Sequence, residues 1–163
     1  LWFFLELFNI KKYSYKIPKK LINLILILLV IQIILGAFLA GLNGGLIYNT
    51  WPDMGGSFFP NDSIFNDYLS LSSFSDPSIV QFFHRTTAYI LLIFVILLNI
   101  YFYKYKLNST EILIFDLSIF IQIFLGIVTL LSGVEIKYAS LHQIGSIFVL
   151  SSFLFIYFKN YKS

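Results

Sequence analysis

Two histidines are the residues of this chain best suited to metal or proton chemistry. His84 stands in "QFFHRTTAY" and His142 in "ASLHQIGS", and the chain has no other histidine. Each lies near the start of a long apolar run, and Arg85, the only arginine, directly follows His84. Because ionisable groups inside a bilayer are costly, such residues indicate a functional site by default. The sequence elements around these residues are needed to determine which function the residues serve.

The composition is that of a membrane protein. Of the 163 residues, 58% are hydrophobic and 12% are charged, whereas about a quarter of a soluble domain is charged. The chain has no cysteine, which excludes disulfides, thiolate metal sites and iron–sulfur clusters. The net charge of +3 reflects lysines clustered beside apolar runs, which is a topology signal rather than a nucleic-acid surface. We therefore expect the lipid bilayer as a partner and no nucleic acid.

Four apolar runs are long enough to cross a bilayer as helices. They cover residues 21–42, 79–103, 112–131 and 141–158. Most lysines lie before the first run, after the second or after the fourth, whereas the long loop 43–77 has no lysine or arginine. By the positive-inside rule, both termini are cytoplasmic and this loop faces outward. The predicted fold is an all-α membrane protein, a bundle of four transmembrane helices.

The bundle accounts for most of the chain. We expect residues 1–10 to be the tail of a preceding helix, so that the chain is a fragment; a short interfacial anchor is the alternative. Residues 11–20 then form a basic cytoplasmic linker, 21–158 the four-helix domain and 159–163 a cytoplasmic tail.

Part of the outer loop has a helical pattern. Ile64, Tyr68 and Leu71 fall at helical spacing. This spacing predicts a short amphipathic helix that lies on the outer face as a lid. An ordinary packed loop is the alternative.

The bundle contains an internal repeat. The segment "IQIILGAFLAGLNGGLIYNT" (31–50) aligns without gaps to "IQIFLGIVTLLSGVEIKYAS" (121–140), and each copy is followed by a run with a histidine near its start. The two helix pairs run in the same direction, so the repeat is parallel and its axis lies along the membrane normal. This symmetry predicts that His84 and His142 face each other at similar depth.

Two facing imidazoles in a four-helix bundle suit a six-coordinate haem. Small residues one turn below each histidine leave room for a flat, wide group. A zinc site needs a third or fourth ligand, and Asp53, Glu135 and Asp116 do not clearly supply one. The alternative is that each histidine only forms hydrogen bonds between helices. We expect Gln32 and Gln122 to form such interhelical bonds.

Arg85 is a weaker candidate than the histidines. It lies about 100° around the helix from His84 and need not contact the same atoms. Near the outer surface, its guanidinium matches the carboxylate of a haem propionate. The alternatives are an arginine that extends to the membrane surface or one that pairs with a loop aspartate. Arg85 has no symmetry mate, because Gln143 holds the equivalent place.

Four motifs, in this order, resemble the haem A synthase family. They are "GLIYNTWPDMGGSFFP", "QFFHRTTAY", "QIFLGIVTLL" and "ASLHQIGS". The resemblance covers residues from about 20 to 158, and it is to the mitochondrial and alphaproteobacterial type, which lacks a cysteine pair in its outer loops. Members of the family have eight spans in two similar four-helix halves. This chain resembles the C-terminal half.

The resemblance implies an oxidoreductase of haem biosynthesis, which oxidises the C8 methyl group of haem O to the formyl group of haem A. It implies that His84 and His142 bind the iron of a b-type haem, with Arg85 as a further cofactor-binding residue. Bis-histidine ligation leaves no open iron position, so this haem relays electrons. The substrate haem O and the catalytic residues belong to the N-terminal half, which the chain lacks.

The family also implies a cellular setting. Haem O synthase and the cytochrome oxidase assembly route are the implied partners, and the implied location is the bacterial inner membrane, or the mitochondrial inner membrane in a eukaryote. Whether the protein forms a homo-oligomer stays open. Two other functions stay open as well. One is a standalone bis-histidine cytochrome b in quinone-linked electron transfer, and the other is a non-enzymatic membrane subunit or transporter half whose histidines only form hydrogen bonds.

Overall fold

The computed structural model describes residues 1–8, 10, 17–62, 70–107 and 110–161. The long helices of this part are α2 (Lys19–Gly41), α3 (Pro77–Lys104), α4 (Thr110–Leu131) and α5 (Ile136–Tyr161). The short ones are α1 (Trp2–Leu7) and the 3₁₀ helices η1 (Gly44–Leu46) and η3 (Leu71–Ser75). No strand occurs among the described residues. The four predicted helices are confirmed, and the last begins earlier than the hydropathy pattern suggested.

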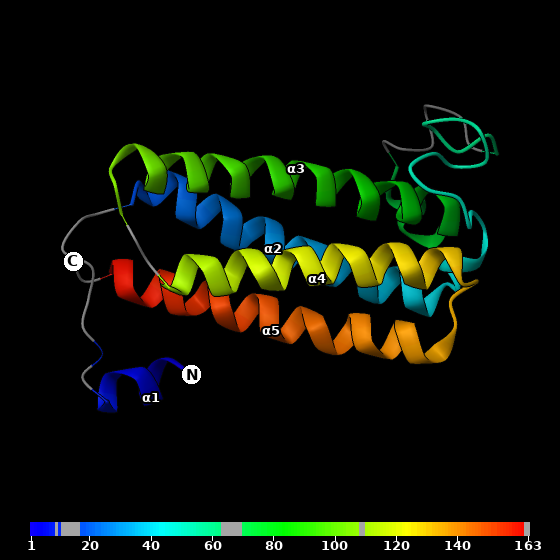
Figure 1. Ribbon diagram of the computed structural model, residues 1–163. Coiled ribbons are helices and arrows are strands. Elements are labelled where there is room, and N and C mark those ends of the chain that lie inside the picture. The colour runs from blue at the N-terminus through cyan, green and yellow to red at the C-terminus, as the bar shows by residue number, and fades with distance from the viewer. Residues whose placement is uncertain (9, 11–16, 63–69, 108–109, 162–163) are drawn as a thin grey trace.

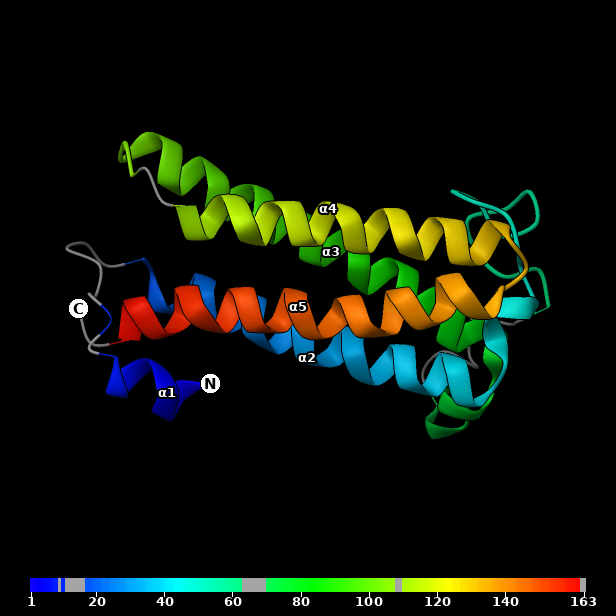
Figure 2. The ribbon, with the colours of Figure 1, turned by 60° about the horizontal axis from the view of Figure 1, so that its bottom comes forward.

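The four long helices lie side by side in one bundle and alternate in direction (Figure 1). Helix α2 packs mainly on α3 and α4 mainly on α5, while α2 also contacts α5. The outer loop lies at one end of the bundle and both chain ends lie toward the other, in both views (Figure 2). We call these the outer and inner ends, after the predicted orientation. All four helices are long and apolar enough to cross a membrane, so the chain is a multi-pass membrane protein.

The start of α3 follows from its local sequence. The Asp76 carboxylate accepts hydrogen bonds from the main-chain N–H groups of Ser78 (2.8 Å) and Ile79 (3.1 Å). Pro77 occupies the first turn of the helix, where a missing N–H costs nothing. This cap fixes the residue at which α3 begins. It thereby fixes the depth of His84 in the bundle.

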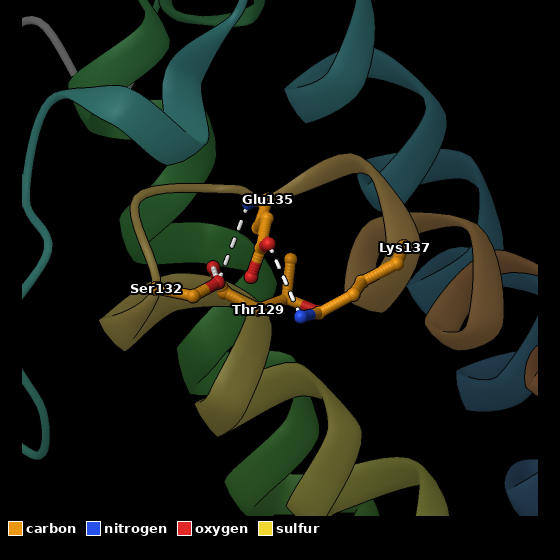
Figure 3. Close-up of polar contacts among 4 residues, drawn as sticks. All are labelled: Thr129, Ser132, Glu135 and Lys137. Atoms are coloured by element: carbon orange, nitrogen blue, oxygen red, sulfur yellow. Dashed lines mark hydrogen bonds and ion pairs between the residues drawn. The ribbon is translucent and has the colours of Figure 1, made fainter.

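The turn between α4 and α5 is closed by short-range polar contacts (Figure 3). Gly133 has a φ of 70°, a left-handed conformation that glycine adopts without strain. Ser132 Oγ donates to the Thr129 carbonyl (3.0 Å) and accepts from the Glu135 N–H (3.3 Å). Glu135 pairs with Lys137 at 3.2 Å, but both side chains are exposed and the pair adds little stability. The direction of α5 is therefore set by the backbone of the turn.

A cluster of buried apolar residues fills the inner half of the bundle. Its residues come from the chain just before α2, the first halves of α2 and α4, and the second halves of α3 and α5. They are Ile17, Ile22, Ile25, Leu29, Leu91, Val95, Leu98, Phe102, Ile112, Phe115, Ile119, Val149, Phe153 and Ile156. The corresponding faces of the outer half carry histidines, glutamines and glycines. Packing in the inner half thus holds the helices together and leaves the outer half for polar chemistry.

Only part of the predicted lid helix can be compared with the structure. Ile64 and Tyr68 lie outside the described residues. Leu71 is the first residue of η3, and its side chain is 89% exposed. The lid helix stays a prediction.

Asn160 fastens the end of α5 to the chain that enters α2. Its side chain is buried, its Oδ1 accepts from the Ile17 N–H (2.7 Å), and its Nδ2 donates to the Ile17 carbonyl (3.2 Å). We predict that Asn160→Leu lowers the free energy of unfolding by about 1–3 kcal/mol, because both backbone groups lose their partner. The measurement is the Tm of the purified protein in detergent.

The matched control is Tyr157→Phe, which removes an exposed hydrogen bond to Asn23 in the same region. The control should leave the Tm nearly unchanged. Equal Tm values for Asn160→Leu and the parent protein would contradict this role.

Candidate functional site

His84 lies on α3 and His142 on α5, both in the outer half of the bundle. At 1.5 Å per residue, they stand about 10 Å and about 9 Å along their helices from the first helical residue. Each residue is partly buried. The structure therefore places both predicted histidines at similar depth in the outer half of the bundle.

Each histidine ring packs against a glycine of the preceding helix. A Cβ atom at Gly36 would lie 3.3 Å from His84 Cε1, and one at Gly126 would lie 2.9 Å from His142 Cε1. Side chains rarely tolerate such distances, so the absence of a Cβ lets each ring sit against the helix backbone. Gly36 and Gly126 are aligned in the sequence repeat, and the same contact occurs in both helix pairs.

A glutamine one turn before each glycine contacts the histidine main chain. Gln32 Nε2 donates to the His84 carbonyl (3.1 Å), and Gln122 Nε2 donates to the His142 carbonyl (2.9 Å). The predicted interhelical bonding of both glutamines is confirmed. Among the described residues, their Oε1 atoms are buried and have no hydrogen-bond partner. Gly145 makes room for this arrangement, since a Cβ there would overlap Gln122 Oε1.

Arg85 contacts the outer loop. Its Nη1 donates to the carbonyls of Thr50 (2.9 Å) and Asp53 (2.7 Å), and its Nη2 donates to the carbonyl of Tyr48 (2.9 Å). Gln81 Nε2 donates to the same Tyr48 carbonyl (2.9 Å). Arg85 therefore fixes the path of the loop backbone. The predicted contact with a loop aspartate is made to the main-chain carbonyl of Asp53 and not to its carboxylate. The contact of Arg85 with a propionate stays a prediction.

A second polar cluster ties the loop to the first turn of α3. The Asp62 carboxylate accepts hydrogen bonds from Tyr48 Oη (2.8 Å) and Ser78 Oγ (2.7 Å). Burial acts to raise the pKa of Asp62, but these hydrogen bonds hold it below its usual value. Burial and the bond to Asp62 raise the pKa of Tyr48. A lowered carboxyl pKa stabilises the folded loop above the ordinary pKa, and this stabilisation is lost as the pH falls through the lowered value.

The loop also reaches the second helix pair. Asn49 Nδ2 donates to the Leu130 carbonyl near the end of α4 (2.9 Å) and to the Gly45 carbonyl (2.7 Å). Since Arg85 holds the same loop on α3, residues 48–53 connect α3 to α4 across the outer end. The outer half of the bundle, which contains both histidines, is therefore bounded by the loop on one side and by the apolar core on the other.

The acidic residues considered as further metal ligands have other partners. Asp116 accepts a hydrogen bond from Asn99 Nδ2 (2.9 Å), and Asp53 Oδ1 accepts from the Gly56 N–H (3.2 Å). Glu135 forms its ion pair at the α4–α5 turn. Across the described ranges, no group of three histidine, aspartate or glutamate side chains could hold a metal ion. A zinc site therefore gains no support.

Three residues that position the loop were not found from the sequence. They are Asn49, Asp62 and Gln81. Gln81 could have been singled out from the sequence, because it stands one turn before His84 in the same motif. The partners of Asn49 and Gln81 are main-chain carbonyls, which no side-chain spacing can indicate.

Comparison with known proteins identifies the family. The sequence profile of the COX15-CtaA family, described as cytochrome oxidase assembly protein, matches residues 1–154. The chain belongs to this family. It is 57% identical over 159 residues to a heme A synthase of Pelagibacter ubique (strain HTCC1062), which covers 98% of the chain and 47% of that protein. The predicted membership of the haem A synthase family is thereby confirmed.

More distant relatives carry the same name. Heme A synthases of Wolbachia sp. subsp. Brugia malayi (strain TRS) and Wolbachia pipientis wMel are 44% and 42% identical to the chain, over 131 and 137 residues. These matches cover 80% and 84% of the chain but 38% of each relative. The chain thus spans less than half the length of these curated relatives. No solved structure gives a significant match.

The contacts of Arg85 predict a measurable effect on the loop. We expect Arg85→Gln to increase the rate of chymotrypsin cleavage within the loop by about tenfold or more, because three bonds from a charged donor to loop carbonyls are lost. The exposed residue Phe58 supplies a cleavage site, because the next residue is Phe59. Trp51 and Phe59 are each followed by proline, which blocks cleavage. Lys137→Gln, at the same end of the bundle, is the control and should not change the rate. A cleavage rate in Arg85→Gln equal to that of the parent would contradict the assignment.

Proposed function

We propose that the outer half of the bundle holds one b-type haem whose iron is bound by His84 and His142. The observation that carries this proposal is the recurrence of one contact, a histidine ring against a glycine, in two helix pairs that meet in the same bundle. The two residues are the only histidines of the chain, and imidazole is a common axial ligand of haem iron.

The residues around the histidines fit such a group. Leu91 and Val149, the first core residues below the pair on α3 and α5, each lie seven residues beyond a histidine. Two helical turns on each side thus separate the rings from the packed core. Gly36 and Gly126 keep the backbone close behind each ring. A flat macrocycle needs this combination of two ligands and small neighbours.

We also propose how Arg85 and the loop serve the site. A guanidinium has five N–H donors, three of which bond to loop carbonyls. We keep a contact between Arg85 and a haem propionate as part of the proposal, because a guanidinium fork matches a carboxylate. The loop held by Arg85 and Asn49 would limit the access of water to the histidine pair.

For the whole protein, we propose the activity that the names of the relatives state, the synthesis of haem A, here by oxidation of haem O. The segment described here would be the half that holds a cofactor haem, and the substrate haem would bind elsewhere in the protein. A haem with two histidine ligands supplies single-electron transfer and has no open position for oxygen. We further propose that the protein lies in a bacterial or mitochondrial inner membrane and acts with haem O synthase in cytochrome oxidase assembly.

The proposal predicts the spectrum of the purified chain. We expect a low-spin b-type haem spectrum from the parent protein. His84→Ala and His142→Ala should each lower the bound haem by about tenfold or more, since each removes an iron ligand. The exposed neighbour Gln143 provides a control, and Gln143→Ala should retain the parent spectrum. A histidine variant that keeps the parent spectrum would rule out that residue as a ligand.

The two glycines predict a graded effect. A methyl group at Gly126 must displace the His142 ring, whereas one at Gly36 meets His84 at a longer distance. We therefore expect Gly126→Ala to lower haem retention more than Gly36→Ala. Gly41→Ala is the control, because a Cβ at that position meets nothing within 4 Å. Equal haem retention in all three variants would show that the rings do not depend on the glycines.

A further inference from the structure

Part of the outer loop folds back along the side of α3. A small cavity between the loop and this helix is lined by Pro52, Met54, Phe58, Phe82, Arg85 and Tyr89. Tyr89 stands about 18 Å along the helix axis from Pro77, the first residue of α3. Gly44, just beyond the end of α2, packs against Pro77, so the outer ends of α2 and α3 are level. The loop backbone therefore reaches a depth at which both helices are inside their apolar runs.

The face of α3 that the loop covers continues inward as a surface for lipid. Phe82, Arg85 and Tyr89 follow one another at spacings of three and four residues, so they form one stripe of the helix. The same spacing extends this stripe through residues 93, 96 and 100, three isoleucines whose side chains are about half exposed. Exposed isoleucines on a spanning helix face the bilayer. The loop thus lies on the outer part of a lipid-facing stripe.

The backbone of the loop has protein partners for its polar groups. The consecutive N–H groups of residues 54–56 donate to the Ser57 carbonyl (2.7 Å), Thr50 Oγ1 (2.9 Å) and Asp53 Oδ1 (3.2 Å). Arg85 donates to three carbonyls of the same segment. A loop in water can leave such groups to the solvent, whereas non-helical backbone at membrane depth needs partners within the protein. The loop meets the stricter requirement.

The side chains of the segment 48–59 suit a membrane interface. Trp51, Phe58 and Phe59 are exposed, and tryptophan is enriched where a protein crosses from lipid to water. Asp53 is the only charged residue of the segment, so the segment and Arg85 together carry no net charge. An uncharged unit with exposed aromatic rings and internally bonded backbone costs little to place in lipid.

We propose that residues 48–59 form a re-entrant segment, seated in the lipid leaflet at the outer end of the bundle, with Trp51, Phe58 and Phe59 in contact with lipid. The partner of this surface is the bilayer, because the surface is continuous with the lipid-facing stripe of α3. Arg85 then supplies hydrogen bonds to a non-helical backbone at membrane depth. This role accounts for an arginine inside an apolar run, and it does not depend on the proposed haem.

Trp51 is a built-in probe of this placement. The chain has two tryptophans, so Trp2→Phe leaves Trp51 alone. In phosphatidylcholine vesicles, we expect lipids brominated high in the acyl chain to lower Trp51 emission by about twofold or more, because interfacial segments reach this depth. Iodide in the water should have little effect. The ratio of emission in brominated and unbrominated vesicles cancels any quenching by bound haem.

Two reference probes bracket the result in a chain that also carries Trp51→Phe. Ile93→Trp, on the lipid-facing stripe, should respond to brominated lipid only. Glu135→Trp, in the exposed turn between α4 and α5, should respond to iodide only. Arg85→Gln should move Trp51 from the first behaviour toward the second, because the loop loses the bonds that hold it against α3.

The other outcomes overturn the inference. Quenching of Trp51 by iodide and not by brominated lipid would place the segment in water. Resistance to both quenchers would place it under another protein surface, such as a second copy of the chain. Unchanged quenching in Arg85→Gln would overturn the role given to Arg85. None of these outcomes bears on haem binding by the histidines, which the spectra of the histidine variants test separately.

Discussion

The close approach of a histidine ring to a glycine backbone is the contact on which the outer half of this bundle depends. A Cβ at Gly126 would come within 2.9 Å of the His142 ring, so any larger residue would force the ring or the helix to move. The glutamine that bonds the histidine carbonyl stands one turn away on the same helix. Together these contacts fix the register of α4 against α5, and Gly36 and Gln32 do the same for α2 and α3.

This constraint explains the division of the bundle into two halves. Large apolar side chains fill the inner half, where Phe115 and Phe153 are fully buried and their ring centroids lie 5.2 Å apart. The outer half has small and polar residues on the corresponding faces, and its end is crossed by a loop that Arg85 and Asn49 hold. The apolar residues that stabilise the bundle and the polar residues of the candidate site thus lie at different depths along the same helices.

The fold was predictable because its main cause is composition. Four apolar runs of sufficient length specify four spanning helices. The hydropathy pattern differed most at the start of α5, where Lys137 and Tyr138 interrupt the apolar run. The similar depth of His84 and His142 was predictable because each copy of the repeat is followed by a run with a histidine near its start. Composition and symmetry both act over many residues, so a single sequence shows them.

The contacts of the loop were less predictable. The sequence offered Arg85 a propionate, the membrane surface or a loop aspartate, and the propionate contact stays a proposal. The three main-chain carbonyls that Arg85 contacts were not expected. Carbonyl groups are common to every residue, and only the folded path of the loop brings these three to one guanidinium.

The most direct test of this account is the haem content of the purified chain, measured together with its EPR spectrum. The account predicts one haem per chain and a low-spin ferric signal of the type given by two imidazole ligands. A chain that binds no haem, or a high-spin signal from an iron with a single histidine ligand, would contradict it.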